Sequence, residues 1–317
     1  MTTGAASALR SVVCDLSFKN PIVLAAGTAG YGEELAGVAR LDAIGGLVTK
    51  AVSVEPRAGA PAPRVAELDA GMLNAVGLAN PGLDVVTRER LPWMAAHLSS
   101  TRKIVNVVGS SVDDYAMVVR GIESSLEGGL AGAVDAFELN VSCPNVKAGG
   151  MEFGADVNVL ASLITAVRRE TRRPLFVKLS PVLPNIAETA RAAVGAGADA
   201  ISAVNTIPGL AIDVERRKPA LGFGSGGMSG PAILPVGVLA TWRVSRAVSV
   251  PVLGVGGVGS ANDALQYILA GASLVGVGTA ALKNPRAPER IARDLEAWCG
   301  DHDVKDIQQL RGALQWT

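Results

Sequence analysis

Short apolar runs alternate with amphipathic segments along almost the whole chain. Eight of the runs have the length and β-branched composition of buried strands, and they begin near residues 21, 46, 103, 136, 174, 200, 251 and 273. Segments with helical spacing lie between them, most clearly residues 154–171, 185–197 and 260–271. This alternation predicts a parallel sheet, because parallel neighbours need a crossover connection, usually a helix. Eight strands close a (β/α)8 barrel, so we expect one TIM-barrel domain over residues 1–317; an open doubly wound sheet has the same pattern.

Three segments add to the expected barrel. Residues 11–20 alternate like a small hairpin, and we expect this N-terminal hairpin to close the bottom of the barrel. Long connections follow the second and sixth strands, at residues 52–80 and 206–230, and the loop after the fourth strand is also long. Connections of this length in a compact domain are usually functional. We expect residues 206–230 and the loop after the fourth strand to form a lid over a bound substrate.

Charge and cysteine usage exclude several functions. The formal net charge is zero, so no basic field would hold nucleic acid or an anionic membrane. Cys14, Cys143 and Cys299 are far apart, which argues against a disulfide framework and against a zinc or iron–sulfur site in this chain. His97 and His302 are the only histidines. A His-based triad and a metal site are therefore not expected.

No targeting or membrane segment is predicted. The first ten residues lack a charged start followed by a long apolar core, so we expect no signal peptide. Residues 264–282 contain no charge and approach the length of a membrane span, but Gly271 interrupts them and a β-like run follows. We expect a buried helix, a turn and a buried strand here, in a cytoplasmic protein.

Polar side chains gather at the ends of the predicted strands. They are Lys50, Asn106, Asn140, Lys178 and Asn205. Any one asparagine could simply cap a helix or close a turn. Barrels, however, carry their chemistry at the C-terminal ends of their strands, so these five would converge on one mouth. Such a mouth would suit a planar, amide-rich ligand.

Two glycine-dense loops follow the last two strands, at residues 254–260 and 276–281. In barrels these two loops commonly bind phosphate through backbone N–H groups. The first loop also matches G-x-G-x-x-G, but it comes late in the chain and no acidic residue about 20 positions on could bind a ribose, which argues against a Rossmann site. The remaining alternative is that the glycines serve only strand–helix packing.

Cys143 follows the fourth strand, in a polar loop between Asn140 and Asn145. A lone cysteine is most often an inert buried side chain. In a positive or hydrogen-bonding environment, however, a thiol of pKa about 8.5 can act as a base near neutral pH. Without a suitably placed histidine, proton abstraction is more natural than Cys–His nucleophilic catalysis.

Seven motifs in fixed order resemble the class 1 dihydroorotate dehydrogenases, most closely class 1B, over about residues 10–300. They are T-K-A-V (49–52), G-M-L-N-A-V-G-L-A-N-P-G (71–82), E-L-N-V-S-C-P-N-V-K-A-G-G (138–150), V-K-L-S-P (177–181), N-T-I-P-G-L-A-I-D (205–213), G-G-M-S-G-P-A (226–232) and G-V-G-G-V (254–258). Class 2 enzymes instead carry a serine base and an N-terminal membrane-binding extension.

The resemblance implies an FMN-containing barrel that oxidises dihydroorotate to orotate in pyrimidine synthesis. It implies that Cys143 removes the C5 proton while hydride passes from C6 to flavin N5, with Lys50 beside flavin and substrate and Lys178 near flavin N1. The implied substrate-binding residues are Lys50, Asn74, Ala75, Val76, Gly77, Leu78, Asn140, Asn145, Asn205 and Thr206. The implied cofactor-binding residues are Ala26, Lys50, Ala51, Asn106, Asn140, Lys178, Val204, Gly230, Gly256, Gly257, Gly278 and Thr279. Ala26 departs from the family, which often has a serine there in contact with FMN.

Class 1B resemblance also implies a partner. These enzymes form homodimers that join a subunit with FAD and a [2Fe-2S] cluster, which passes electrons to NAD, in a heterotetramer. Alternatives remain: a class 1A homodimer linked to fumarate, a barrel like that of dihydropyrimidine dehydrogenases, a barrel aldolase using Lys50 or Lys178 as a Schiff base, and a flavin-binding barrel that has lost catalysis.

Overall fold

The computed structural model of the protein describes residues 7–142 and 153–316. Eight parallel strands form a closed barrel in the order β10-β15-β16-β3-β4-β7-β8-β9. Their bounds are β3 (Ile22–Leu24), β4 (Gly46–Val48), β7 (Arg102–Val107), β8 (Ala136–Asn140), β9 (Leu175–Leu179), β10 (Ala200–Ala203), β15 (Val252–Val255) and β16 (Leu274–Val277). The predicted (β/α)8 barrel is thus confirmed, and closure rules out the open sheet.

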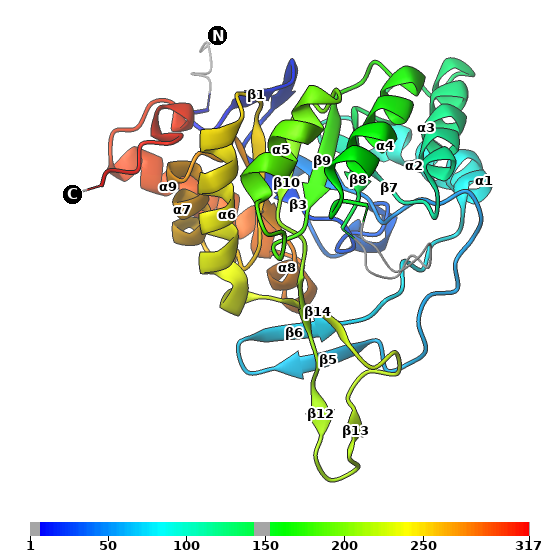
Figure 1. Ribbon diagram of the computed structural model, residues 1–317. Coiled ribbons are helices and arrows are strands. Elements are labelled where there is room, and N and C mark those ends of the chain that lie inside the picture. The colour runs from blue at the N-terminus through cyan, green and yellow to red at the C-terminus, as the bar shows by residue number, and fades with distance from the viewer. Residues whose placement is uncertain (1–6, 143–152, 317) are drawn as a thin grey trace.

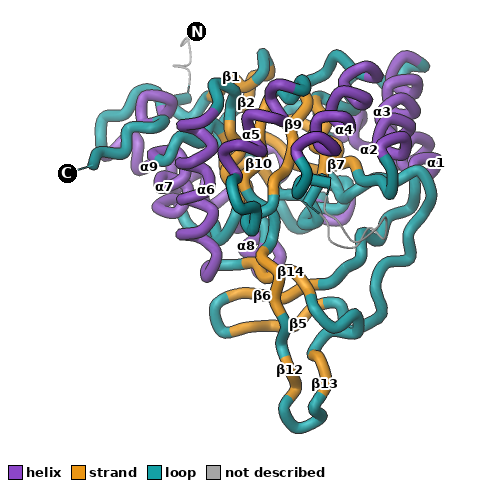
Figure 2. The backbone as a smooth tube through the Cα atoms, viewed as in Figure 1, coloured by secondary structure: helices purple, strands orange, loops and turns teal. Residues whose placement is uncertain are grey.

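Helices surround the barrel (Figure 1, Figure 2). They are α1 (Leu83–Val85), α2 (Leu91–His97), α3 (Val112–Glu127), α4 (Val157–Glu170), α5 (Ile186–Gly195), α6 (Leu234–Ala247), α7 (Ala261–Leu269), α8 (Thr279–Lys283) and α9 (Ala287–Asp301). Shorter helical turns are η1 (Glu33–Leu35), η2 (Leu41–Ala43), η3 (Val86–Arg90), η4 (Pro231–Ile233) and η5 (Ile307–Leu310). The three helical segments predicted most clearly correspond to α4, α5 and α7.

Local sequence explains where these helices begin. Ser111 and Asp114 form a reciprocal capping box before α3, and Asp156 caps α4 by accepting from two backbone N–H groups. The uncharged stretch 264–282 contains the end of α7, a turn and β16, as predicted, and then the start of α8. Among the described residues, none of the helices combines the length and the apolar character that crossing a membrane requires.

An N-terminal hairpin closes one end of the barrel. It consists of β1 (Ser11–Val13) and β2 (Leu16–Phe18), and lies at the end opposite β14 in Figure 1. Val13 and Phe18 are almost fully buried and pack against the first inward-facing layer of the barrel strands. That layer consists of Val23, Val48, Ile104, Ala136, Phe176, Ala200, Leu253 and Leu274. The prediction that the hairpin closes the barrel bottom is confirmed.

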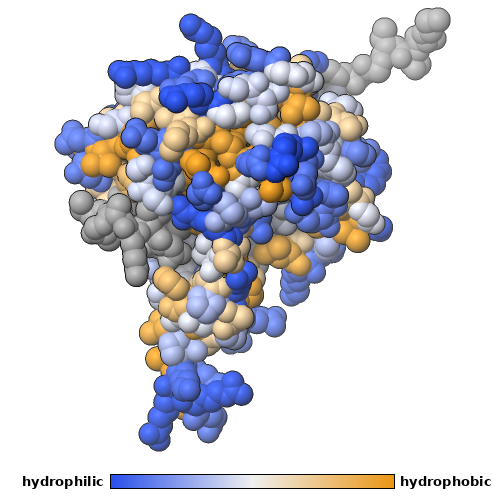
Figure 3. All heavy atoms as spheres, turned by 90° about the vertical axis from the view of Figure 1, so that its right-hand side faces the viewer, coloured by the Kyte–Doolittle hydropathy of each residue, from blue (hydrophilic) through white to orange (hydrophobic). Residues whose placement is uncertain are grey.

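The two long connections meet in one antiparallel sheet at the other end of the barrel. Its order is β11-β14-β6-β5, with bounds β5 (Val65–Leu68), β6 (Gly71–Asn74), β11 (Ile207–Gly209) and β14 (Gly226–Ser229). A further hairpin of β12 (Ile212–Asp213) and β13 (Lys218–Pro219) projects beyond it (Figure 1). Figure 3 shows hydrophilic side chains over its tip. The sequence indicated two separate functional loops, whereas the structure shows that they pair with each other.

Candidate active site

Four neighbouring strands each place a polar side chain inside the barrel. These side chains are Asn106 on β7, Glu138 on β8, Lys178 on β9 and Ser202 on β10. Each follows a member of the apolar bottom layer by two positions, and alternation along a strand therefore points it inward as well. All four are at most 6% exposed. A polar layer thus lies directly above the apolar layer, toward the C-terminal ends of the strands.

Glu138 connects the members of this layer. Asn106 Nδ2 donates to Glu138 Oε1 at 2.8 Å, and Ser202 Oγ donates to Glu138 Oε2 at 2.7 Å. Glu138 and Ser202 are not among the site residues predicted from the sequence. The available signal was spacing: both stand at inward-facing positions, Glu138 two residues before Asn140.

Two polar groups in this layer lack partners within the described structure. Asn106 Oδ1 is buried and accepts no hydrogen bond from a described residue. Lys178 is 6% exposed, and no described carboxylate lies within 4.0 Å of its ammonium group. Buried polar groups nearly always find a partner, so an acceptor and a cation left unpaired at a barrel mouth indicate a place for a polar ligand.

Asn140 and Asn205 meet directly above this layer. Asn205 Nδ2 donates to Asn140 Oδ1 at 3.2 Å and to Ser142 Oγ at 2.6 Å, while Asn205 Oδ1 accepts from the Thr206 N–H at 2.8 Å. The predicted convergence of these two asparagines is confirmed. Ser142 is 4% exposed and was not predicted. The next residue, Cys143, and also Asn145 lie outside the described residues.

All three tyrosines of the chain donate hydrogen bonds to backbone carbonyls of predicted site residues. Tyr31 donates to Ala51 at 3.2 Å, Tyr115 to Asn140 at 2.8 Å and Tyr267 to Gly256 at 2.7 Å. Burial raises the pKa of Tyr31 and of Tyr267, so both hydroxyls remain protonated donors at neutral pH. Tyr115 on α3, Tyr267 on α7 and Tyr31 in the turn before η1 therefore fix the backbone of the mouth from outside the barrel strands.

The glycine loops after β15 and β16 lie close to β14. Gly256 and Gly257 have φ of 132° and 74°, in the region that favours glycine, and a Cβ on Gly257 would lie 2.7 Å from the backbone nitrogen of Leu234. Thr279 Oγ1 donates to Ser229 Oγ at 2.8 Å, next to Gly230. Gly278 is the N-cap residue of α8 and provides no side-chain hydrogen bond to the start of the helix. The loop after β15 therefore packs against the start of α6, and the loop after β16 contacts the end of β14.

Other predicted residues lie in the connections around this mouth. Asn74 ends β6, and its amide donates to the Gly227 carbonyl on β14 at 3.1 Å. The following loop has positive φ at Gly77 and Leu78. Lys50 follows β4, and its backbone N–H donates to Gly30 at 2.7 Å. The rest occupy the same loops or strand ends: Ala26, Ala75, Val76 and Val204.

The other described cysteines have environments unlike that of a reactive thiol. Burial, with the nearby carboxylates of Asp199 and Asp15, raises the pKa of Cys14 from 9.0 to about 12. Burial also raises the pKa of Cys299, which is 1% exposed. Both thiols stay protonated near neutral pH, so neither is suited to act as a base.

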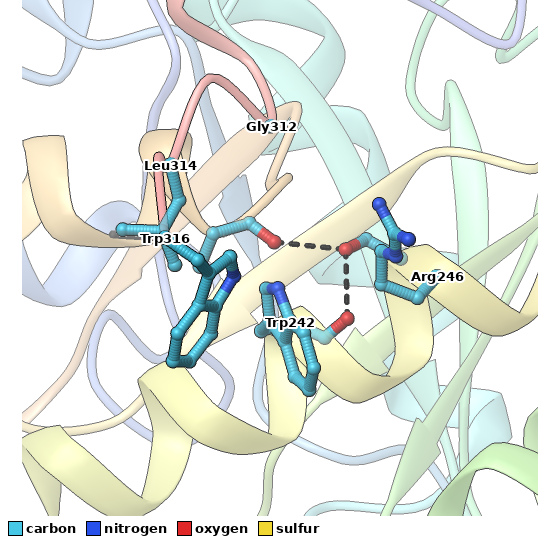
Figure 4. Close-up of a pocket in the computed structure, with 7 residues that line it drawn as sticks. Trp242, Arg246, Gly312, Leu314 and Trp316 are labelled. Atoms are coloured by element: carbon cyan, nitrogen blue, oxygen red, sulfur yellow. Dashed lines mark hydrogen bonds between the residues drawn. The ribbon is translucent and has the colours of Figure 1, made fainter.

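A pocket of about 400 Å³ lies away from this mouth, between α6 and the C-terminal residues (Figure 4). Trp242 and Trp316 meet there edge to face, with ring centroids 5.4 Å apart, and the Arg246 side chain lies nearby. Ser245 Oγ donates to the backbone carbonyls of Trp242 and Ala270. None of the predicted site residues lines this pocket.

Comparisons with known proteins agree over nearly the whole chain. A sequence model described as dihydroorotate dehydrogenase matches residues 8–298. The catalytic subunit of dihydroorotate dehydrogenase B (NAD(+)) from Trichlorobacter lovleyi is 47% identical over 300 residues, covering 95% of this chain and 96% of the relative. The protein of the same name from Desulforudis audaxviator is 46% identical over 305 residues, covering 96% and 97%. The crystal structure of DHODH from Eimeria tenella in complex with ferulenol has a TM-score of 0.82 at 23% identity and covers 99% of this chain and 90% of its own, which supports the fold alone.

Proposed function

Since this chain belongs to the dihydroorotate dehydrogenase family, we propose that it oxidises dihydroorotate to orotate in pyrimidine synthesis, as the catalytic subunit of an NAD-linked enzyme. The observation that carries this proposal is the full-length similarity to NAD-linked catalytic subunits, at 47% and 46% identity. The closed barrel with polar groups gathered at one mouth is the arrangement that such chemistry needs.

The residues at the mouth fit FMN. The buried, unpartnered Asn106 Oδ1 can accept from the ring N–H of an oxidised flavin, and Lys178 offers a positive charge where reduction would add a negative one. Gly256, Gly257 and the uncapped Gly278 offer backbone N–H groups to a phosphate. When bound there, FMN supplies the acceptor for the substrate hydride. The other proposed flavin contacts are Ala26, Lys50, Ala51, Asn140, Val204, Gly230 and Thr279.

The substrate would lie over the flavin, held by hydrogen bonds from the same mouth. The paired amides of Asn140 and Asn205 offer donors and acceptors suited to the ring amides of dihydroorotate. Lys50 offers a cation to its carboxylate. The remaining proposed contacts are Asn74, Ala75, Val76, Gly77, Leu78, Asn145 and Thr206. In this arrangement Cys143, which follows the hydrogen-bonded Ser142, takes the C5 proton as the base.

Electron transfer to NAD requires a partner subunit in this proposal. A [2Fe-2S] cluster is normally held by four cysteines, and this chain has three, of which Cys14 and Cys299 are far apart in sequence. We therefore propose that a homodimer of this chain joins an FAD and iron–sulfur subunit, in the cytoplasm. The lid formed by residues 206–230 and the Cys143 loop belongs to the same proposal.

An anaerobic titration tests the function. Dihydroorotate is added to the purified chain while the visible flavin band is followed, and fumarate is added afterwards to the same cuvette. Bleaching that fumarate does not reverse supports the NAD-linked assignment. Reversal by fumarate would indicate the class 1A alternative, and a flavin-loaded protein that does not bleach would refute the substrate. Equal hydrogen exchange with and without orotate in both loops would refute the lid.

A further inference from the structure

Glu138 is a buried carboxylate without a described cationic partner. It is 1% exposed, and no described lysine or arginine lies within 4.0 Å of it. Its two oxygens accept hydrogen bonds only from Asn106 and Ser202 among the described residues. Burying a charged group with so few partners is costly, so stability alone does not explain why a glutamate occupies position 138.

The pairing with Glu138 determines which way the Asn106 amide points. Asn106 turns its NH₂ group toward Glu138 and donates to Oε1 at 2.8 Å, the bond that a carboxylate oxygen accepts. The carbonyl oxygen then points elsewhere, and it is the buried Asn106 Oδ1 that no described residue contacts. A hydrogen-bond donor in place of the carboxylate would favour the opposite orientation of the Asn106 amide. The amide would then present its NH₂ group to the mouth in place of its carbonyl oxygen.

We propose that Glu138 is a positioning residue that locks the Asn106 amide so that the barrel mouth presents a hydrogen-bond acceptor to the flavin ring. This inference rests on the proposed function, because it takes FMN as the ligand. Oxidised flavin carries one ring N–H, which needs an acceptor and would be opposed by an NH₂ group. Glu138 therefore acts on the flavin through Asn106 and not by contact.

Glu138 also places a negative charge below the proposed flavin site. It pairs in register with Phe176, and Lys178 lies two positions farther along the same face of β9. The two opposite charges therefore lie on adjacent strands, both on the inward face of the barrel. A negative charge at this depth opposes reduction, which adds electrons to the flavin, so its removal is expected to raise the flavin midpoint potential.

Two variants of Glu138 separate its charge from its role toward the amide. E138M has a side chain of similar length that cannot accept from Asn106 Nδ2. Its Kd for FMN should therefore rise about tenfold, as expected for the loss of one buried hydrogen bond. E138Q keeps a carbonyl oxygen that can accept, so its Kd for FMN should stay within about threefold. Both remove the charge, and both should raise the midpoint potential. FMN release from diluted holoprotein is followed by flavin fluorescence, and the potential by equilibration with redox dyes.

A double-mutant cycle tests whether Glu138 acts through Asn106. N106A alone should raise the Kd for FMN about tenfold. Adding E138M in the N106A background should raise that Kd by less than about twofold further. S202A is the matched control, because it removes the other hydrogen bond to Glu138 without facing the amide. Additive losses in N106A and E138M, or an E138Q variant as weak as E138M, would overturn the inference.

A measurement on the unmutated protein covers the case in which E138M does not fold. FMN methylated at the ring N–H should displace bound FMN at least about tenfold less effectively than unmodified FMN. Equal displacement would overturn the inference. Bleaching of the unmutated protein by dihydroorotate reports on the proposed function separately, since that outcome does not depend on any Glu138 variant.

Discussion

Tyr267 holds the glycine loop after β15 from behind, and replacing it with phenylalanine removes only that hydroxyl. The Gly256 carbonyl that accepts from it at 2.7 Å belongs to the same planar peptide as the Gly257 N–H. In a trans peptide the two groups point in opposite directions, so fixing the carbonyl toward α7 directs the N–H away from it. The N–H has no acceptor among the described residues and is free for a phosphate.

The expected magnitude follows from burial. Tyr267 is fully buried and Gly256 is buried as well, so Y267F leaves an unsatisfied carbonyl and should lower the free energy of unfolding by about 1–3 kcal/mol. The loosened peptide must then be ordered again when a phosphate binds. We expect this to cost about 1 kcal/mol, or roughly a fivefold loss of affinity for the phosphate.

Comparing FMN with riboflavin isolates the phosphate contribution. The ratio of the riboflavin Kd to the FMN Kd, measured by quenching of flavin fluorescence, should fall about fivefold in Y267F. Y115F is the matched control: it removes a hydroxyl bonded at 2.8 Å to the Asn140 carbonyl, far from the glycine loops in sequence, and should leave the ratio unchanged. A ratio that falls equally in both variants, or in neither despite a lower melting temperature, would refute the reasoning.

Four further predictions concern the thiols, the barrel bottom and the glycine loop after β15. Cys14 and Cys299 have raised pKa values, so rapid alkylation at pH 8 should modify one thiol per chain, and this labelling should disappear in C143S. Rapid labelling that persists in C143S would contradict the assignment of Cys143 as the reactive thiol. The pKa of Cys14 is about 12 in the folded protein against 9.0 in the unfolded chain, so its contribution to stability is complete below pH 9 and is lost as pH rises toward 12. In urea unfolding, the loss of stability between pH 8 and pH 10 should therefore be smaller in C14A than in the unmutated protein. F18A should lower stability by about 3–5 kcal/mol without changing flavin potential, since Phe18 is 0% exposed at the end opposite the mouth; a shifted potential in the folded variant would disagree. G257A should lose FMN while keeping its fold by circular dichroism, because φ is 74° and a Cβ would lie 2.7 Å from a backbone nitrogen; normal FMN content would count against the phosphate site.

The sequence predicts the barrel well because each strand and helix is encoded locally. Period-two and period-3.6 patterns, a capping box before α3 and glycines after β15 are all short-range signals. Strand-end positions were also enough to predict that Asn140 and Asn205 would meet, since parallel strands of a barrel share one mouth. For the barrel itself, only the choice between a closed ring and an open sheet required the structure.

What the sequence does not reveal depends on contacts between distant residues. Glu138 stands in an apolar run and can be read simply as part of a buried strand, because its role depends on Asn106 and Ser202, 32 and 64 positions away. Tyr267 is one of several buried residues on α7, and nothing local shows that its hydroxyl reaches Gly256. The pairing of β6 with β14 is equally hidden, since both strands are short and glycine-containing.

The pairing of β6 with β14 has a consequence for transplanting loops between barrels. Connections on a TIM barrel are often treated as independent modules, each exchangeable without its neighbours. Here residues 71–74 and 226–229 are strands of one sheet, so the second and sixth connections form a single unit of exchange (Figure 1). A chimaera that replaces one of them leaves unpaired backbone groups on the other. The natural place to insert new sequence is the β12–β13 hairpin, which pairs only with itself among the described strands.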